Sequence, residues 1–135
     1  MEDVIQSLLS SSREIAVIGL SEKPDRDSYQ VACYLQAQGY HIIPVNPNVA
    51  EILGEKSFAS LKEVPGPVDI VNIFRKPEAV PEIVEEAILK GAKAIWMQEG
   101  IRHEEAAEKA RQAGILVIMD RCLFKEHRRR TGGSL

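Results

Sequence analysis

Hydrophobic and polar positions follow a repeating order along the chain. Stretches with apolar residues three and four positions apart are each followed by a short continuous apolar run. A glycine separates the two at three places, Gln38-Gly39-Tyr40, Lys90-Gly91-Ala92 and Ala113-Gly114-Ile115, as expected where a left-handed residue ends a helix. This repeat predicts a parallel sheet whose strands are joined by helical crossovers.

Five strands are predicted from the apolar runs at residues 15–19, 40–45, 68–74, 94–97 and 115–119. Helices are predicted at 4–9, 31–38, 80–88 and 106–113, with a short one at 60–63, where a capping-box pattern occurs. We therefore expect a Rossmann-like α/β fold: a doubly wound parallel five-stranded sheet with helices on both faces, in a single domain spanning residues 1–135. The natural strand order is 3-2-1-4-5, although the flavodoxin-like order is not excluded.

Two further placements follow from the same pattern. Cys33 lies within a predicted helix and is expected in the core. The basic segment at 126–130 is expected to be a frayed surface helix rather than a binding arm.

Composition narrows the function classes. The 135 residues carry a formal charge of −3, which gives no broad field for collecting nucleic acid. The acidic start, Met1-Glu2-Asp3, and the lack of a long apolar run argue against a signal peptide or a membrane span. Two cysteines in the whole chain fit a reducing compartment. We expect a cytoplasmic protein that binds neither nucleic acid nor membranes.

The first candidate site is the segment after the first apolar run. In open α/β sheets, ligands bind beyond the carboxyl ends of the strands, and this segment leads into a helix N-terminus, where backbone N–H groups favour a phosphate. It lacks the G-x-G-x-x-G fingerprint, and an ordinary solvated loop with Ser28 as the N-cap is the alternative. The candidate binding residues here are Gly19, Leu20, Ser21, Lys23, Arg26 and Ser28.

The second apolar run ends in Val45-Asn46-Pro47, the candidate wall for an adenine ring. A dinucleotide site usually has an acidic residue near this point to hold the ribose of NAD. Because none is present, a phosphorylated ribose, as in coenzyme A or NADP, fits better than NAD. Simple turn chemistry is the alternative for each residue.

The third and fourth apolar runs end in residues suited to binding a nucleotide and a pantetheine arm attached to it. Phe74 and Arg75, followed by Lys76, offer an aromatic surface and cations, with Arg75 the preferred phosphate clamp and a solvated loop the alternative. Trp96 is a candidate to flank a pantetheine arm, and Gln98 a candidate to hydrogen-bond it. Core packing is the alternative role for Trp96.

Cys122 follows the fifth run beside Arg121, which raises the hypothesis of a nucleophile. The sequence places no histidine near it, and structural cysteines are common in protein interiors. No metal-ligand spacing and no hydrolase motif is present either. We therefore expect a binding module with no catalytic activity of its own.

These motifs together, in order and spacing, resemble the stand-alone CoA-binding domain proteins, relatives of the N-terminal domain of the succinyl-CoA synthetase α subunit. The motifs are Val17-Ile18-Gly19-Leu20-Ser21 with Pro24, Arg26 and Ser28; Pro44-Val45-Asn46-Pro47; residues 71–75; Ile95-Trp96-Met97-Gln98-Glu99-Gly100; and Met119-Asp120-Arg121-Cys122.

The resemblance implies coenzyme A as the ligand, bound across the carboxyl ends of the strands. Its phosphates would lie near residues 19–26 and its adenosine near residues 45–47 and 74–75. The ligase activity of the synthetase is not implied, because its phosphohistidine domain is not expected here. A carrier, sensor or regulatory module for CoA or an acyl-CoA is the leading hypothesis. An NADP-binding redox or regulatory domain and an enzyme acting on CoA thioesters through Cys122 are the alternatives, and a protein partner is left open.

Overall fold

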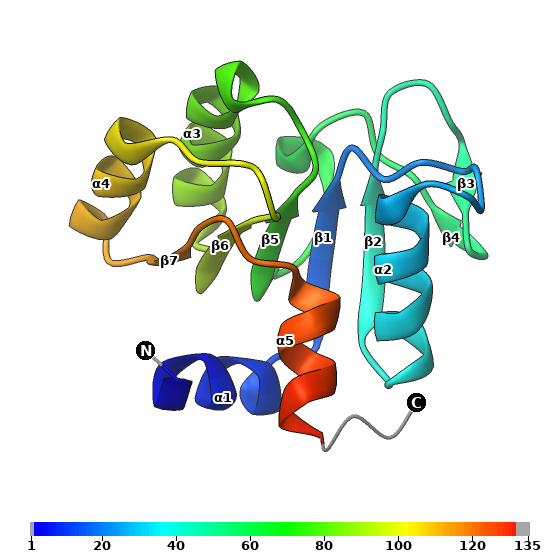
Figure 1. The fold of residues 1–135 in the computed structure, drawn as a ribbon. Helices are drawn as coiled ribbons and strands as arrows, with labels where there is room; N and C mark the ends of the chain where they lie inside the picture. Colours follow the sequence, from blue (N-terminus) through cyan, green and yellow to red (C-terminus); the bar gives the residue numbers. More distant parts are fainter. Residues whose placement is uncertain (1, 132–135) are drawn as a thin grey trace.

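A computed structural model describes residues 2–131 of the chain, and Figure 1 shows a single α/β domain with helices on both faces of a central sheet. The helices are α1 (Glu2–Ser11), α2 (Asp27–Ala37), α3 (Val80–Lys90), α4 (Glu104–Gln112) and α5 (Leu123–Arg130), with 3-10 turns η1 (Leu61–Glu63) and η2 (Pro77–Ala79). The strands of the main sheet are β1 (Glu14–Ile18), β2 (His41–Val45), β5 (Ile70–Ile73), β6 (Ala94–Met97) and β7 (Leu116–Ile118). A small hairpin consists of β3 (Glu51–Ile52) and β4 (Glu55–Lys56).

All five strands of the main sheet are parallel, in the order β2-β1-β5-β6-β7. The expected order 3-2-1-4-5 is therefore wrong, and the flavodoxin-like order 2-1-3-4-5 is found. The reason is visible in Pro44, which has no N–H to donate and is tolerated in a strand at the edge of a sheet. Its carbonyl faces outward and accepts from the Phe58 N–H at 3.0 Å, so β2 forms the edge.

Successive residues of a strand point to opposite faces of the sheet and belong to two hydrophobic clusters, one on each face. Ala16 and Ile18 pack with the inner sides of α3 and α4, whereas Ile15 and Val17 pack with α1, α2 and α5. Figure 1 shows α3 and α4 side by side, with α2 and α5 together across the sheet from them. Burial on both faces explains why the strands are almost uninterrupted apolar runs.

Two local predictions differ from the structure, and one element was not predicted. Cys33 is exposed, because Val31, Ala32 and Leu35 form the inner face of α2. The segment at 126–130 is not a frayed helix, because it is the last part of α5, in which Leu123 and His127 are buried. The hairpin β3–β4 has no predicted counterpart, since its turn uses Leu53 at φ 56° before Gly54, a position that a leucine seldom occupies.

None of the helices between residues 2 and 131 is both long enough and apolar enough to cross a lipid bilayer.

Candidate functional site

The turn after β1 depends on Gly19. This residue has a φ of 88°, in the region that only glycine adopts readily. A Cβ built on it would lie 2.6 Å from the Phe74 carbonyl oxygen, and its N–H donates to the Val45 carbonyl at 2.9 Å. Gly19 thus brings the ends of three adjacent strands, β2, β1 and β5, into close contact.

The loop that follows is held by its serines. The Ser28 hydroxyl accepts from the Ser21 N–H at 3.0 Å, and the Ser21 hydroxyl accepts from the Lys23 N–H at 3.0 Å. The N-cap of α2 is Arg26, with no side-chain cap, so Ser28 is not the N-cap that the solvated-loop interpretation expects. The loop curls back on α2 and leaves the Lys23 and Arg26 side chains exposed.

Asn46 ties the end of β2 to the same loop. Its Nδ2 donates to the Leu20 carbonyl at 2.9 Å, and its Oδ1 accepts from the Asn48 N–H at 2.9 Å. Both ends of the amide are therefore used to fix the backbone around Pro47, which is exposed. This arrangement gives the loop a defined shape before any ligand arrives.

The largest cavity at the carboxyl ends of the strands has a volume of about 630 Å³ and lies between the N-terminal ends of α2 and α5. That volume is in the range of small-molecule sites. Its lining comes from four segments: Asp27, Gln30 and Val31; Phe74, Arg75 and Lys76; Gln98, Glu99, Gly100 and Ile101; and Cys122, Phe124 and Lys125.

Two smaller cavities adjoin it. One of about 340 Å³ is lined by Gly19, Ser21 and residues 25–28, and it shares Asp27 and Phe74 with the large cavity. The other, of about 240 Å³, lies beside Val45 and η1 and shares Arg75. Phe74 and Arg75 thus stand at the centre of a strip of three cavities, which we call the strand-end strip.

The strip contains free cations. Among residues 2–131, the Arg26, Arg75 and Lys76 side chains form no hydrogen bond or ion pair, although all three line these cavities. Most other basic side chains are paired, as Lys125 is with Glu99 at 3.1 Å. An exposed cation without an acidic partner is available to an anionic ligand.

The first loop is less cationic than its lysine and arginine suggest. Between residues 21 and 28, Glu22, Asp25 and Asp27 outnumber Lys23 and Arg26 by three to two. An anion in this loop would therefore depend on backbone N–H groups at the start of α2 and on the cations that reach it from the end of β5.

Several predicted residues lie in the protein interior. Leu20 and Trp96 are fully buried in the cluster beneath α2 and α5, and the Trp96 indole N–H donates to the Arg121 carbonyl at 2.8 Å. In this structure Trp96 therefore packs in the hydrophobic core, which was the alternative to flanking a pantetheine arm. Val45 is also buried, although it borders the smallest cavity of the strip.

Gln98 and Cys122 are nearly buried residues in the wall of the large cavity. Gln98 is 5% exposed, and its Oε1 accepts from the Leu123 N–H at the start of α5 at 3.3 Å. Cys122 is 8% exposed and is the N-cap residue of α5. Both residues line the cavity, so they are accessible to a ligand in it.

Sequence reasoning missed the contribution of the helix starts. Gln30 and Val31 of α2 and Phe124 and Lys125 of α5 line the cavity, although the two helices are about ninety residues apart in sequence. The only available signal was the rule that the helices flanking a sheet begin at its carboxyl edge. That rule does not say which two helices pack together.

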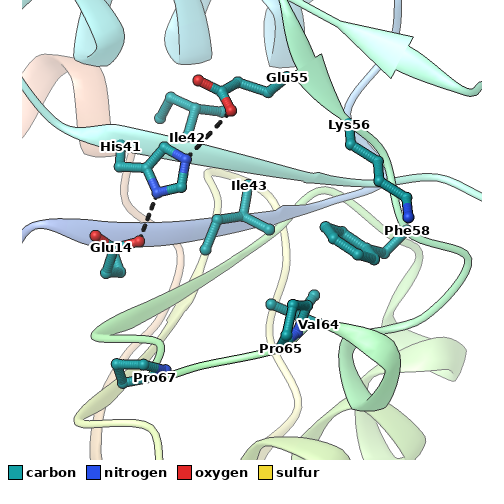
Figure 2. Close-up of a pocket in the computed structure, with 10 residues that line it drawn as sticks. All are labelled: Glu14, His41, Ile42, Ile43, Glu55, Lys56, Phe58, Val64, Pro65 and Pro67. Carbon is teal, nitrogen blue, oxygen red and sulfur yellow. Dashed lines mark hydrogen bonds and ion pairs between the residues drawn. The ribbon is translucent and has the colours of Figure 1, made fainter.

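A separate cavity of about 200 Å³ lies at the amino ends of β1 and β2. Figure 2 shows its apolar wall, which includes Phe58 and Pro65, and the His41 ring between two carboxylates. His41 Nδ1 lies 2.5 Å from Glu14 Oε1 and Nε2 lies 3.2 Å from Glu55 Oε1. The hydrogen bond to Glu14 is the main cause of the raised pKa of His41. Because the wall is apolar and two carboxylates lie beside it, this cavity does not suit a phosphate group.

Comparison with known proteins agrees with this geometry. The profile of a family described as "CoA binding domain" matches residues 13–128. The uncharacterized protein YneT of Bacillus subtilis is 46% identical over 123 residues, which cover 91% of each chain. A hypothetical protein from Pyrococcus horikoshii has a solved structure that superposes with a TM-score of 0.93 at 40% identity and covers 96% of this chain and 91% of its own.

A second kind of relative is longer. The α subunit of the ADP-forming acetate–CoA ligase II of Pyrococcus furiosus is 34% identical over 122 residues, which cover 82% of this chain. The matching region is 27% of that subunit. The chain therefore corresponds to about a quarter of the ligase subunit.

Proposed function

The chain belongs to the CoA-binding domain family, and from this premise we propose that it binds coenzyme A or an acyl-CoA in the strand-end strip. The observation that carries the proposal is the set of unpaired cations Arg26, Arg75 and Lys76 around cavities at the carboxyl edge of the sheet. Burying phosphate charge without a cationic partner is unfavourable, and these side chains can supply that partner.

The three cavities suggest how the ligand is divided among them. The diphosphate would lie against the loop after Gly19, where the start of α2 presents backbone N–H groups. The adenosine would lie toward residues 45–47, with Arg75 within reach of its phosphate. The pantetheine arm would enter the 630 Å³ cavity, where Gln98 offers an amide.

The role proposed for this binding is that of a carrier, sensor or regulatory module. No cluster of three metal-ligating side chains occurs in residues 2–131, and the Cys122 thiol lines the cavity proposed for the arm. Both cysteines are free thiols, in keeping with the cytoplasmic location that we propose.

Calorimetry with four ligands tests the proposal. We expect CoA to bind, and 3′-dephospho-CoA to bind at least about tenfold more weakly, a difference of roughly 1.4 kcal/mol, because it lacks the phosphate proposed to pair with Arg75. NADP and NAD serve as competitors for the same strip. Binding of NADP with none of CoA would contradict the proposal and favour a redox or regulatory nucleotide domain.

A further inference from the structure

The most unusual buried group in the protein is the side chain of Asn72. This residue lies in β5, the central strand of the sheet, and is 0% exposed. Neither Nδ2 nor Oδ1 has a hydrogen-bond partner. They are the only such buried side-chain atoms among the described residues. An amide in this position has lost its hydrogen bonds to water and gained nothing in return, so it destabilises the fold.

The surroundings of Asn72 offer no reason for a polar residue. Its partners in register on the neighbouring strands are Val17 and Trp96. Both belong to the apolar cluster beneath α2 and α5, and the indole N–H of Trp96 is already bonded to a carbonyl. An apolar side chain of similar size would fit this position better.

The position relative to the large cavity supplies a reason. Side chains two residues apart on a strand point to the same face, about 7 Å apart. The next residues on this face of β5 and β6, toward the carboxyl ends, are Phe74 and Gln98, and both line the cavity. Asn72 therefore lies one layer of side chains beneath the floor of the cavity.

We propose that Asn72 is the innermost hydrogen-bonding group of the ligand site and bonds the amide-bearing arm of coenzyme A. This inference rests on the proposed function and adds a residue that recognises the arm. The Nδ2 group needs an acceptor and Oδ1 needs a donor, and the amides of a pantetheine arm carry both. Gln98 lines the cavity two residues beyond Trp96, the partner of Asn72 in register, and its Oε1 accepts one hydrogen bond of 3.3 Å from the Leu123 N–H of α5. We infer that this side chain turns aside when the arm reaches Asn72.

The experiment compares the wild-type protein with Asn72→Leu, which removes the amide and keeps the same branched arrangement of heavy atoms. Each is titrated with CoA and with adenosine 3′,5′-bisphosphate, which lacks the arm, and the midpoint of thermal unfolding is measured without ligand. Val71→Ala is the matched control, because Val71 is the adjacent residue of β5 and faces the opposite cluster.

We expect Asn72→Leu to raise the unfolding midpoint of the free protein, to weaken CoA at least tenfold, and to change affinity for the bisphosphate less than twofold. Val71→Ala should lower the midpoint and leave both affinities unchanged. Higher stability with unchanged CoA affinity would overturn the inference. An equal loss for both ligands would also overturn it. Failure of the wild-type protein to bind CoA would refute the proposed function itself, and this inference with it.

Discussion

The Cα of Gly19 lies against the carbonyl oxygen of Phe74, so closely that a Cβ would stand 2.6 Å from that oxygen. The other atoms within reach belong to the Arg75 side chain, at 3.3 Å. The contact joins the end of β1 to the end of β5 where the three cavities meet. Any side chain at residue 19 must move either the backbone of β5 or the arginine.

Gly19→Ala should therefore be strongly destabilising. We expect a loss of about 3 kcal/mol in the free energy of unfolding, from the positive φ together with the clash against a backbone atom, measured by urea denaturation. Gly39→Ala is the control, because Gly39 has a φ of 100° but nothing within 4 Å of a Cβ. It should lose only about 1 kcal/mol. Equal losses would show that the contact with Phe74 does not matter.

Arg75→Ala should reduce affinity for CoA and leave the fold intact. Arg75 is exposed and its side chain forms no hydrogen bond or ion pair with the described residues, so its removal costs little stability. We expect CoA to bind about tenfold more weakly, or roughly 1.4 kcal/mol, and the preference over 3′-dephospho-CoA to disappear in calorimetry. Arg13→Ala removes the same charge at the opposite end of β1, and it should leave the CoA affinity unchanged.

Asn46→Ala should loosen the proposed adenosine wall. The substitution leaves the Leu20 carbonyl and the Asn48 N–H without their side-chain partner, and we expect a loss of about 1–2 kcal/mol in unfolding free energy. Because Asn48 contributes only its backbone to this pair of bonds, Asn48→Ala is the control and should be nearly neutral. A neutral Asn46→Ala would mean that the loop is held by its two prolines instead.

The contribution of His127 to stability should fall in mild acid, whereas His41, whose pKa is raised, contributes in the opposite direction. Burial lowers the pKa of His127 from its ordinary value of 6.5, and its Nδ1 lies 2.7 Å from the Tyr34 hydroxyl. Below pH 6.5 the unfolded chain binds the proton more readily than the folded one, so the free energy of unfolding falls until the lower, folded pKa is passed.

His127→Phe provides the comparison, since a phenyl ring keeps the aromatic contacts and does not titrate. Unfolding is measured by denaturant at pH values between 7 and 5. The decline in unfolding free energy toward acid should be smaller in the variant than in the wild type. Parallel profiles would assign the acid sensitivity to other groups.

The two thiols should react with a disulfide reagent at very different rates. Cys33 is exposed on α2, whereas Cys122 is 8% exposed in the cavity, so Cys122 should react more slowly, as a partly protected group. Saturating CoA should slow Cys122 further and leave Cys33 unchanged. The variants Cys33→Ser and Cys122→Ser identify which thiol is measured. If the reaction rate of Cys122 does not change when CoA is added, CoA binds elsewhere.

Local information in the sequence determined the strands of the main sheet, most of the helices and the position of Gly19 in the candidate site. Apolar runs broken by glycine located the five strands of the main sheet, because burial on both faces excludes polar residues from them. Gly19 was identified by its place at the end of the first apolar run, because ligands of open α/β sheets bind beyond the carboxyl ends of the strands. The family resemblance given by the same motifs is confirmed.

Relations between distant segments were decided only by the tertiary structure. Pro44 carried a signal for the edge position of β2, but the order of strands depends on which crossover packs on which face, and local periodicity does not record it. The same holds for Cys33, whose exposure depends on the side that α2 presents to the sheet. It holds equally for Asn72, since a sequence does not reveal that a central amide lacks a partner. The pattern of residues defines which side of each segment can be buried, whereas the packing of α2 against α5 defines the cavity between their N-terminal ends.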